Sequence, residues 1–344
     1  MTRKFRRAVV TGGAGFLGSR VCERLLAQGT AVLCLDNFIT SSGCDVTVPP
    51  GAPAFEVRLQ DVTEPFDVDG PVDLVMHLAS PASPVAYARY PLETLNSGSA
   101  GTRNALDLAA RTGARFVLAS TSEVYGDPQV SPQDEGYYGN VNPVGPRSVY
   151  DEAKRYAEAL TAAYQRTGHA DTAIARIFNS YGPGMRPDDG RMVPTFACQA
   201  LRGEPVTVTG DGTQTRSLCH ADDTVRGLLL LAASDLAGPV NIGNPDETTV
   251  GDIAARIIAL AGSRSPIRYV PLPADDPMAR KPDITLARAM LGFEPRIGWR
   301  EGLTETIAWF RAVVDGSPAL SRPGRAIAWP AAPRAVVVRT GGAA

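Results

Sequence analysis

The stretch Ala8-Val-Val-Thr-Gly-Gly-Ala-Gly-Phe-Leu-Gly18 joins a short β-branched run to three glycines spaced G-x-x-G-x-x-G. An apolar segment with helical spacing follows, so the order is strand, glycine turn and helix. Glycines at this spacing permit a tight turn, close approach of the backbone to a pyrophosphate, and close helix–strand packing. The helix N-terminus then offers amide donors to phosphates. The stretch predicts a dinucleotide site; an ordinary glycine turn is the alternative.

The second predicted strand, residues 31–35, determines which dinucleotide is expected. It ends at Asp36, 18 residues beyond Gly18. An acidic residue in this position accepts hydrogen bonds from a ribose 2′-hydroxyl and repels a 2′-phosphate. The sequence therefore predicts NAD rather than NADP.

Tyr150 and Lys154 stand four residues apart in a segment with helical spacing, so they share one helix face. An ammonium beside a phenol favours the phenolate, so we expect Lys154 to lower the pKa of Tyr150. Such a tyrosine takes a proton from an alcohol in the step that accompanies hydride removal. Taken alone, the pair is more typical of a solvated helix face, but the predicted dinucleotide site favours the catalytic interpretation.

Alternating strands and helices run through the first half of the chain. Strands are predicted at residues 55–58, 72–78, 116–120 and 172–178, and helices at residues 92–111 and 149–166. This alternation predicts an α/β fold with a doubly wound, Rossmann-like parallel sheet, whose ligands bind beyond the carboxyl ends of the strands. We expect an NAD-binding domain over residues 1–179, to which some later segments return. A smaller C-terminal substrate-binding region over 180–316 and a surface tail over 317–344 complete the division.

Composition excludes several other classes of function. The chain has 344 residues and a net charge of −2, which gives no indication of nucleic acid or anionic membrane as a partner. Neither a signal-peptide core nor an 18-residue apolar span is present, so we expect a soluble, cytoplasmic protein. Five cysteines without C-x-x-C spacing and three scattered histidines predict free thiols and no metal site.

Three longer strings carry a resemblance to a known family. They are His77-Leu-Ala-Ser-Pro-Ala-Ser-Pro84, Ser120-Thr-Ser-Glu-Val-Tyr-Gly-Asp-Pro128 and Arg280-Lys-Pro-Asp-Ile284. With the motifs above, the chain resembles the extended short-chain dehydrogenase/reductase superfamily and, within it, the UDP-glucuronic acid decarboxylases (UDP-xylose synthases). The resemblance covers residues 7 to about 310. Related 4,6-dehydratases carry an Asp-Glu pair after the threonine, where this chain has Ser122-Glu123, and 4-epimerases usually lack the glutamate.

The resemblance implies NAD-dependent conversion of UDP-glucuronate to UDP-xylose through a 4-keto intermediate, with NAD regenerated in each cycle. The alternatives are a decarboxylase that releases the 4-keto pentose, a 4-epimerase or a 4,6-dehydratase; a catalytically inactive NAD-binding regulator is disfavoured by the intact Tyr-Lys pair. The catalytic residues implied are Tyr150, Lys154, Thr121, Ser122, Glu123 and Arg280. The cofactor would contact Gly12, Gly15, Phe16, Leu17, Gly18, Asp36, Asn37, Asp61, Val62, Leu78, Ala79, Ser80, Tyr150 and Lys154. The UDP-sugar would contact Asn179, Arg191, Arg216 and Tyr87.

Four positions depart from the family pattern. Gly184 stands where arginine is expected, with Arg186 as the candidate replacement, and His220 replaces a tyrosine. Gly98 and Asn96 occupy places where asparagine and lysine are common. The superfamily also implies a homodimer through the helices 92–111 and 149–166, for which we expect the small apolar residues Ala105, Leu108, Ala109, Ala153, Ala157 and Leu160 to provide the interface.

Overall fold

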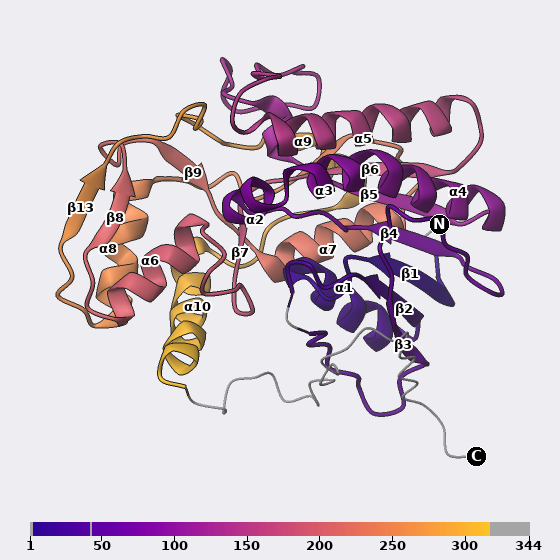
Figure 1. Cartoon of the computed structure of the whole chain (residues 1–344), viewed down its shortest axis with the longest axis horizontal. Coiled ribbons are helices and arrows are strands. Elements are labelled where there is room, and N and C mark those ends of the chain that lie inside the picture. The colour runs from indigo at the N-terminus through magenta and orange to yellow at the C-terminus, as the bar shows by residue number, and fades with distance from the viewer. Residues whose placement is uncertain (1–2, 42, 317–344) are drawn as a thin grey trace.

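Seven parallel strands form the central sheet of the computed structural model, which describes residues 3–41 and 43–316 (Figure 1). The strand order is β11-β6-β5-β4-β1-β2-β3. These strands are β1 (Arg7–Thr11), β2 (Ala31–Asp36), β3 (Phe55–Leu59), β4 (Leu74–His77), β5 (Arg115–Thr121), β6 (Thr172–Ile177) and β11 (Val240–Ile242). The strand order reverses between β1 and β4, and a crevice for ligands is expected beyond their carboxyl ends. The predicted doubly wound sheet is confirmed.

Helices cover both faces of the sheet, and in Figure 1 they lie above and below it. One face packs on α1 (Phe16–Ala27) and α7 (Ala221–Ala232), the other on α4 (Thr102–Thr112) and α5 (Ser148–Arg166). Successive side chains of a strand point to opposite faces, so every strand needs apolar residues on both sides. In β1, Ala8 and Val10 pack toward the first pair of helices while Val9 packs toward the second.

The predicted helix over 92–111 consists of three consecutive helical segments. α3 (Pro91–Asn96) leads into a π-helical turn, Ser97–Gly101, and then into α4. Gly98 lies in this turn, against α5, where an added Cβ would approach the backbone oxygen of Ala153 to 2.6 Å. The asparagine common at this place in the family does not fit against the α5 backbone as it lies here, which gives the departure a physical reason.

Most of the chain after residue 180 forms a second cluster of elements, at the left in Figure 1. Its helices are α6 (Met192–Leu201), α8 (Val250–Ala261) and α10 (Trp299–Val314), which share one apolar core. Its strands pair two by two: β7 (Ser180–Tyr181) with β10 (Cys219–His220), β9 (Thr215–Ser217) with β12 (Glu247–Thr249), and β8 (Val206–Thr209) with β13 (Ile267–Val270). The remaining short elements are α2 (Pro84–Arg89), the 3₁₀ turn Ser122–Tyr125 and α9 (Thr285–Leu291). Two later segments, α7 and β11, belong to the layers of the first part.

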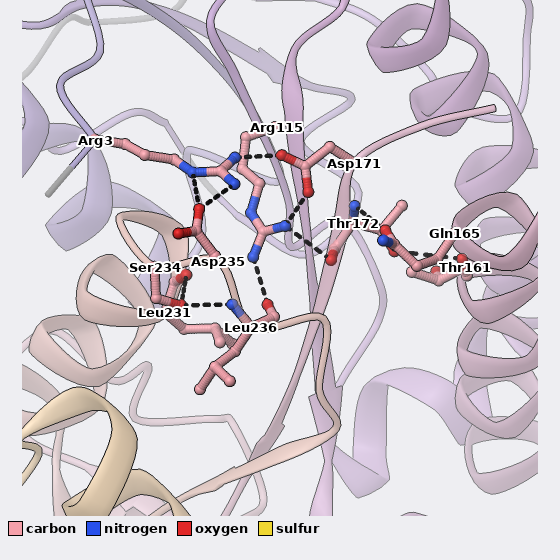
Figure 2. Close-up of polar contacts among 10 residues, drawn as sticks. All are labelled: Arg3, Arg115, Thr161, Gln165, Asp171, Thr172, Leu231, Ser234, Asp235 and Leu236. Carbon is pink, nitrogen blue, oxygen red and sulfur yellow. Dashed lines mark hydrogen bonds and ion pairs between the residues drawn. The ribbon is translucent and has the colours of Figure 1, made fainter. Parts of the chain in front are cut away.

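A polar network joins segments that lie far apart in the sequence at the amino ends of β5 and β6 (Figure 2). Arg115 is almost fully buried and donates to Asp171 and to the backbone oxygens of Thr172 and Leu236. Asp171 also pairs with Arg3 from the N-terminal segment. The network links the amino ends of β5 and β6 to the N-terminal segment, because the buried guanidinium of Arg115 needs hydrogen-bond partners.

Further expectations from the sequence concern the cysteines, membrane-spanning segments and the C-terminal tail. Within the described residues, all five cysteines are free and buried. In the same residues, none of the helices has the length and apolar character needed to cross a membrane. The predicted surface tail over 317–344 lies outside the described residues.

Candidate active site

A cleft of about 690 Å³ lies at the carboxyl ends of the strands, between the sheet and the second cluster of elements. Nineteen of the twenty-two predicted site residues line it: Gly12, Gly15, Phe16, Leu17, Gly18, Asp36, Asn37, Asp61, Val62, Leu78, Ala79, Ser80, Thr121, Ser122, Glu123, Tyr150, Lys154, Asn179 and Arg191. The other three, Tyr87, Arg216 and Arg280, lie behind its wall. The fold therefore brings together residues that the sequence separates by up to 179 positions.

The glycine turn forms one end of the cleft and leaves no room for side chains. Gly12 has φ +70°, and a Cβ there would lie 2.6 Å from the backbone nitrogen of Ala79. A Cβ on Gly18 would lie 2.0 Å from the backbone oxygen of Gly12. Gly15 precedes α1 and offers no side-chain cap in the described structure, so the first amides of α1 are available to a ligand. A pyrophosphate fits such a turn.

Asp36 closes the same end of the cleft. Its carboxylate accepts hydrogen bonds from the backbone nitrogens of Ala14 (3.0 Å) and Phe38 (2.8 Å), which fixes its orientation. Burial raises the Asp36 pKa, although these two hydrogen bonds oppose the rise. Beside it, Asn37 donates to Asp61 over 3.0 Å. The turn and the acidic residue together fit a dinucleotide with a free ribose 2′-hydroxyl.

Tyr150 and Lys154 lie on one face of α5, and both are buried at the cleft. The ammonium of Lys154 donates to the backbone oxygen of Ala119 over 2.9 Å and lies 5.8 Å from the centre of the Tyr150 ring. Burial lowers the pKa of Lys154 to about 8. The solvated-face alternative is wrong, because neither side chain faces bulk water.

The sequence predicted that the pKa of Tyr150 is lowered, and the structure corrects this prediction. Burial raises this pKa above its ordinary value, since removing the phenol from water disfavours the phenolate. Arg191 and a hydrogen bond with Thr121 lower it, and Glu123 raises it further. Sequence spacing indicated the neighbour but could not measure the burial, which is the larger effect here.

Glu123 follows the strand end at Thr121 and is held between two guanidinium groups. Arg147 donates to it over 2.6 Å, and Arg280 forms a second ion pair with it. Burial alone would raise the Glu123 pKa, but these two arginines lower it to about 2. Arg280 is only 1% exposed and also donates to the backbone oxygen of Gly126 over 2.9 Å, so it is not a surface residue.

The ion pairs continue beyond Glu123. Asp276 accepts from Arg147 over 3.4 Å and from Arg216 over 3.0 Å. We call Glu123, Asp276, Arg147, Arg216 and Arg280 the arginine–carboxylate cluster. Arg147 and Asp276 were not predicted from the sequence. The only sequence signal was the position of Arg147, three residues before Tyr150.

The residues proposed for the UDP-sugar are distributed around these groups. Arg191 donates to Asp189 (3.1 Å) and to the backbone oxygen of Ala82 (2.7 Å) at the edge of the cleft. Tyr87 stacks on Tyr150, with ring centres 5.5 Å apart. The buried Oδ1 of Asn179 has no hydrogen-bond partner among the described residues, so a ligand donor would satisfy it.

Two of the departures from the family pattern also have defined surroundings. Arg186 lines the cleft but donates to Asp188 and to the backbone oxygen of Thr40. His220 is buried and accepts from the backbone nitrogen of Asp222 over 3.3 Å, at the start of α7. The position of His220 is therefore explained by helix capping.

Comparisons with known proteins agree with this geometry. Residues 8–243 match the model of the NAD dependent epimerase/dehydratase family, and the chain belongs to that family. A solved UDP-glucose 4-epimerase of Thermotoga maritima, in complex with UDP-glucose, superimposes with a TM-score of 0.80. It is 28% identical, and the match covers 90% of this chain and 99% of the epimerase. NAD is the cofactor, and the glycine turn and Asp36 fit it.

Relatives with higher sequence identity to this chain define its family more narrowly. UDP-glucuronic acid decarboxylase 4 of Arabidopsis thaliana is 49% identical over 316 residues, which cover 92% of this chain and 71% of that protein. UDP-glucuronic acid decarboxylase 1 of Danio rerio is 47% identical over 305 residues, covering 89% and 72%. Within the larger family the chain belongs to the UDP-glucuronic acid decarboxylases, and the resemblance seen in the sequence is confirmed.

Proposed function

We propose that this chain converts UDP-glucuronate to UDP-xylose and carbon dioxide, with NAD regenerated in each cycle. The observation that carries the proposal is the position of Glu123, held ionised by two arginines beside the buried pair Tyr150 and Lys154. This arrangement combines a group that can take a proton from an alcohol with cations suited to a sugar carboxylate. Its setting is a family whose relatives are UDP-glucuronic acid decarboxylases.

NAD, which the glycine turn and Asp36 would hold, would supply a reversible hydride acceptor for C4 of the sugar. Tyr150 takes the proton of the 4-hydroxyl, and its hydrogen bond with Thr121 places a second hydroxyl at the same oxygen. Arg191 places positive charge near the phenol, which opposes the effect of burial on its pKa, and the Lys154 ammonium lies 5.8 Å from the ring centre. The product of this step is a 4-keto sugar whose C6 carboxylate is β to the ketone.

A β-keto carboxylate loses carbon dioxide readily because its electrons move into an enolate. The hydroxyl groups of Tyr150 and Thr121 would donate to that oxyanion, where negative charge develops. Glu123 stays ionised at neutral pH, so its charge opposes a second carboxylate placed beside it and favours departure as neutral carbon dioxide. Arg280 and Arg147 hold Glu123 in place while this occurs.

Ser122 argues against the dehydratase alternative. A 4,6-dehydratase needs an acid to protonate the leaving hydroxyl, and a serine hydroxyl is too weak an acid for that task. In the structure Ser122 accepts from Arg280 over 3.4 Å, which occupies it as part of the wall around Glu123. No described feature favours the epimerase or dehydratase reaction.

The decisive experiment is incubation of the NAD-bound protein with UDP-glucuronate carrying ¹³C at C6, without added reductant. We expect labelled carbon dioxide and UDP-xylose, identified by nuclear magnetic resonance. The Tyr150→Phe variant is the matched control; it should form neither product and no reduced cofactor. An unchanged substrate, with UDP-glucose or dTDP-glucose converted instead, would refute the proposal. Accumulated 4-keto pentose would show that the hydride is not returned.

We infer that the protein forms a homodimer, although not through most of the residues expected from the sequence. Ala105, Leu108, Ala109 and Ala157 are buried in the core between these helices and the sheet, and Ala153 is buried against Gly98. Leu160, the sixth residue expected, is partly buried against the same core. The apolar side chains that α3 and α5 expose are instead Leu92, Leu95 and Tyr156. These two helices contact each other, and we propose that their exposed apolar side chains pack against a second copy. The domain division at residue 179 and the cytoplasmic location stay predictions.

A further inference from the structure

Asp151 is a buried carboxyl group that the mechanism above does not use. It lies in the first turn of α5, next to Tyr150, and is 5% exposed. Its Oδ1 has no hydrogen-bond partner among the described residues. The charges that act on it are those of Glu123, Arg147, Arg280 and the neighbouring Glu152, and its own charge acts on Tyr87 and Tyr150. Asp151 is therefore next to the arginine–carboxylate cluster but is not hydrogen-bonded to it.

The hydrogen bonds within the cluster are made to the other two acids. Arg147 donates to Glu123 and Asp276, and Arg216 donates to Asp276. Arg280 pairs with Glu123 and keeps one buried donor, Nε, without a partner among the described residues. The cluster thus has one unused donor and, at Asp151, one unused acceptor. The positive charge of the cluster would attract an incoming carboxylate, whereas an ionised Asp151 would repel it.

Charge balance makes the protonation state of Asp151 important. Three guanidinium groups face two paired carboxylates, so the cluster carries one net positive charge when Asp151 is neutral and none when it is ionised. An ionised carboxylate that is buried without a hydrogen bond is unfavourable. Burial, and next the charge of Glu123, raise the pKa of Asp151 to about 7, although Arg147 and Arg280 oppose them. The group can therefore change its state under ordinary conditions.

We propose that Asp151 determines specificity for a carboxylate-bearing sugar nucleotide, because substrate binding fixes a proton on Asp151 and so keeps the net positive charge that the sugar carboxylate requires. This inference rests on the proposed function. Asp151 is a positioning residue, since it acts through the charge of the cluster rather than by contact with the sugar. UDP-glucuronate would bind with proton uptake, whereas UDP-glucose, which has a hydroxymethyl group at the same place, would not.

The direction in which the affinity for UDP-glucuronate changes with pH follows from the linkage between substrate binding and protonation of Asp151. The form that binds UDP-glucuronate carries the extra proton, so affinity falls as pH rises through the Asp151 pKa. Above that pKa the fall approaches about tenfold per pH unit. Lys154 also titrates, near pH 8. The Asp151→Asn variant separates the two groups, because it removes the uptake at Asp151 and keeps Lys154.

The test is isothermal titration calorimetry of NAD-bound Tyr150→Phe protein, which cannot turn over the substrate. Titrations in buffers of different ionisation enthalpy give the number of protons taken up. At pH 7 we expect UDP-glucuronate to take up about half a proton more than UDP-glucose, since a group with its pKa near that pH is half ionised. At pH 8 the excess should approach one proton, and affinity for UDP-glucuronate should be about tenfold weaker than at low pH.

Adding Asp151→Asn to the Tyr150→Phe protein gives a second test, because the substitution should strengthen the binding of UDP-glucuronate at pH 8. The amide keeps the shape of the side chain and fixes it as neutral, so proton uptake should disappear and affinity for UDP-glucuronate at pH 8 should rise about tenfold. A purely structural role for Asp151 would instead weaken binding at every pH. Glu204→Gln is the control, because Glu204 is an exposed carboxylate of the second cluster of elements and should leave the uptake unchanged.

Equal proton uptake for the two sugar nucleotides would overturn the inference. So would an Asp151→Asn variant that binds UDP-glucuronate more weakly than its parent at pH 8. If the Asp151→Asn variant does not fold, the proton uptake of the Tyr150→Phe protein with the two sugar nucleotides still tests the inference. A protein that decarboxylates UDP-glucuronate but shows equal uptake would retain the proposed function and lose only this inference.

Discussion

Replacing Arg280 by methionine tests the site most directly, because the substitution removes a buried charge and leaves an apolar stem of similar length. Arg280→Met deprives Glu123 of one of its two guanidinium partners and leaves the backbone oxygen of Gly126 without its donor. We expect bound NAD to be retained, since Arg280 lies behind the wall of the cleft, away from the glycine turn. Xylose formation should be lost.

The magnitude follows from the state of Glu123. A fall of its pKa from 4.5 to about 2 corresponds to roughly 3 kcal/mol in favour of the ionised form, shared by two arginines. Without Arg280, Glu123 stays ionised at neutral pH but is held by Arg147 alone, so its carboxylate is no longer fixed in one position. A misplacement of about 1 Å at a reacting centre costs on the order of 10²-fold in rate, which is the loss of carbon dioxide release that we expect.

The assay measures carbon dioxide release and, on the same preparation, the NAD freed by denaturation. Arg288→Met is the matched control, because Arg288 pairs with Glu294 on the surface and its loss should change neither quantity. Full activity in Arg280→Met would refute the role assigned to the Glu123 pair. Loss of NAD together with activity would show that Arg280 supports the fold rather than the reaction.

Four further outcomes are expected. Apo protein should bind NAD more tightly than NADP by roughly 1–4 kcal/mol, because a 2′-phosphate would lie beside the Asp36 carboxylate; Asp36→Ala should narrow the difference in a titration of both cofactors. Turnover should fall as pH rises through about 8, where buried Lys154 loses its charge, and a rate that stays flat to pH 10 would contradict this. Arg115→Met should lower the free energy of unfolding by roughly 2–6 kcal/mol in urea denaturation, because two buried carbonyls lose their donor; an unchanged midpoint would contradict this. Light scattering should show a dimer at micromolar concentration that Leu92→Lys with Tyr156→Lys converts to monomer, and a wild-type monomer would refute the proposed interface.

The sequence predicted the sheet well because each strand is a short run of β-branched and apolar residues that ends in a turn. The glycine turn and Asp36 could be placed for the same reason: their chemistry depends on residues close together in the chain. The predicted bounds differ from the observed ones by one or two residues at most strand ends, where side-chain pattern and hydrogen bonding diverge.

Features that depend on distant contacts could not be predicted in the same way. Arg147 and Asp276 meet only because two loops fold over Glu123, and no spacing in the chain records that. The rise in the Tyr150 pKa depends on burial, which a motif does not show. The interface residues were misplaced because helical periodicity identifies an apolar face but does not reveal whether a sheet or a second copy covers it, as Ala109 illustrates.

The place of β11 at the end of the sheet determines how the chain can be divided. Val240–Ile242 pairs in parallel with β6, so this hydrogen-bonding edge of the sheet is covered by a segment from the middle of the predicted substrate-binding region. A fragment cut at residue 179 would keep the glycine turn but leave β6 as a bare edge, which invites pairing with other chains. The substrate-binding region cannot be exchanged between relatives as a simple C-terminal module, because the exchange would also replace one strand of the cofactor-binding sheet.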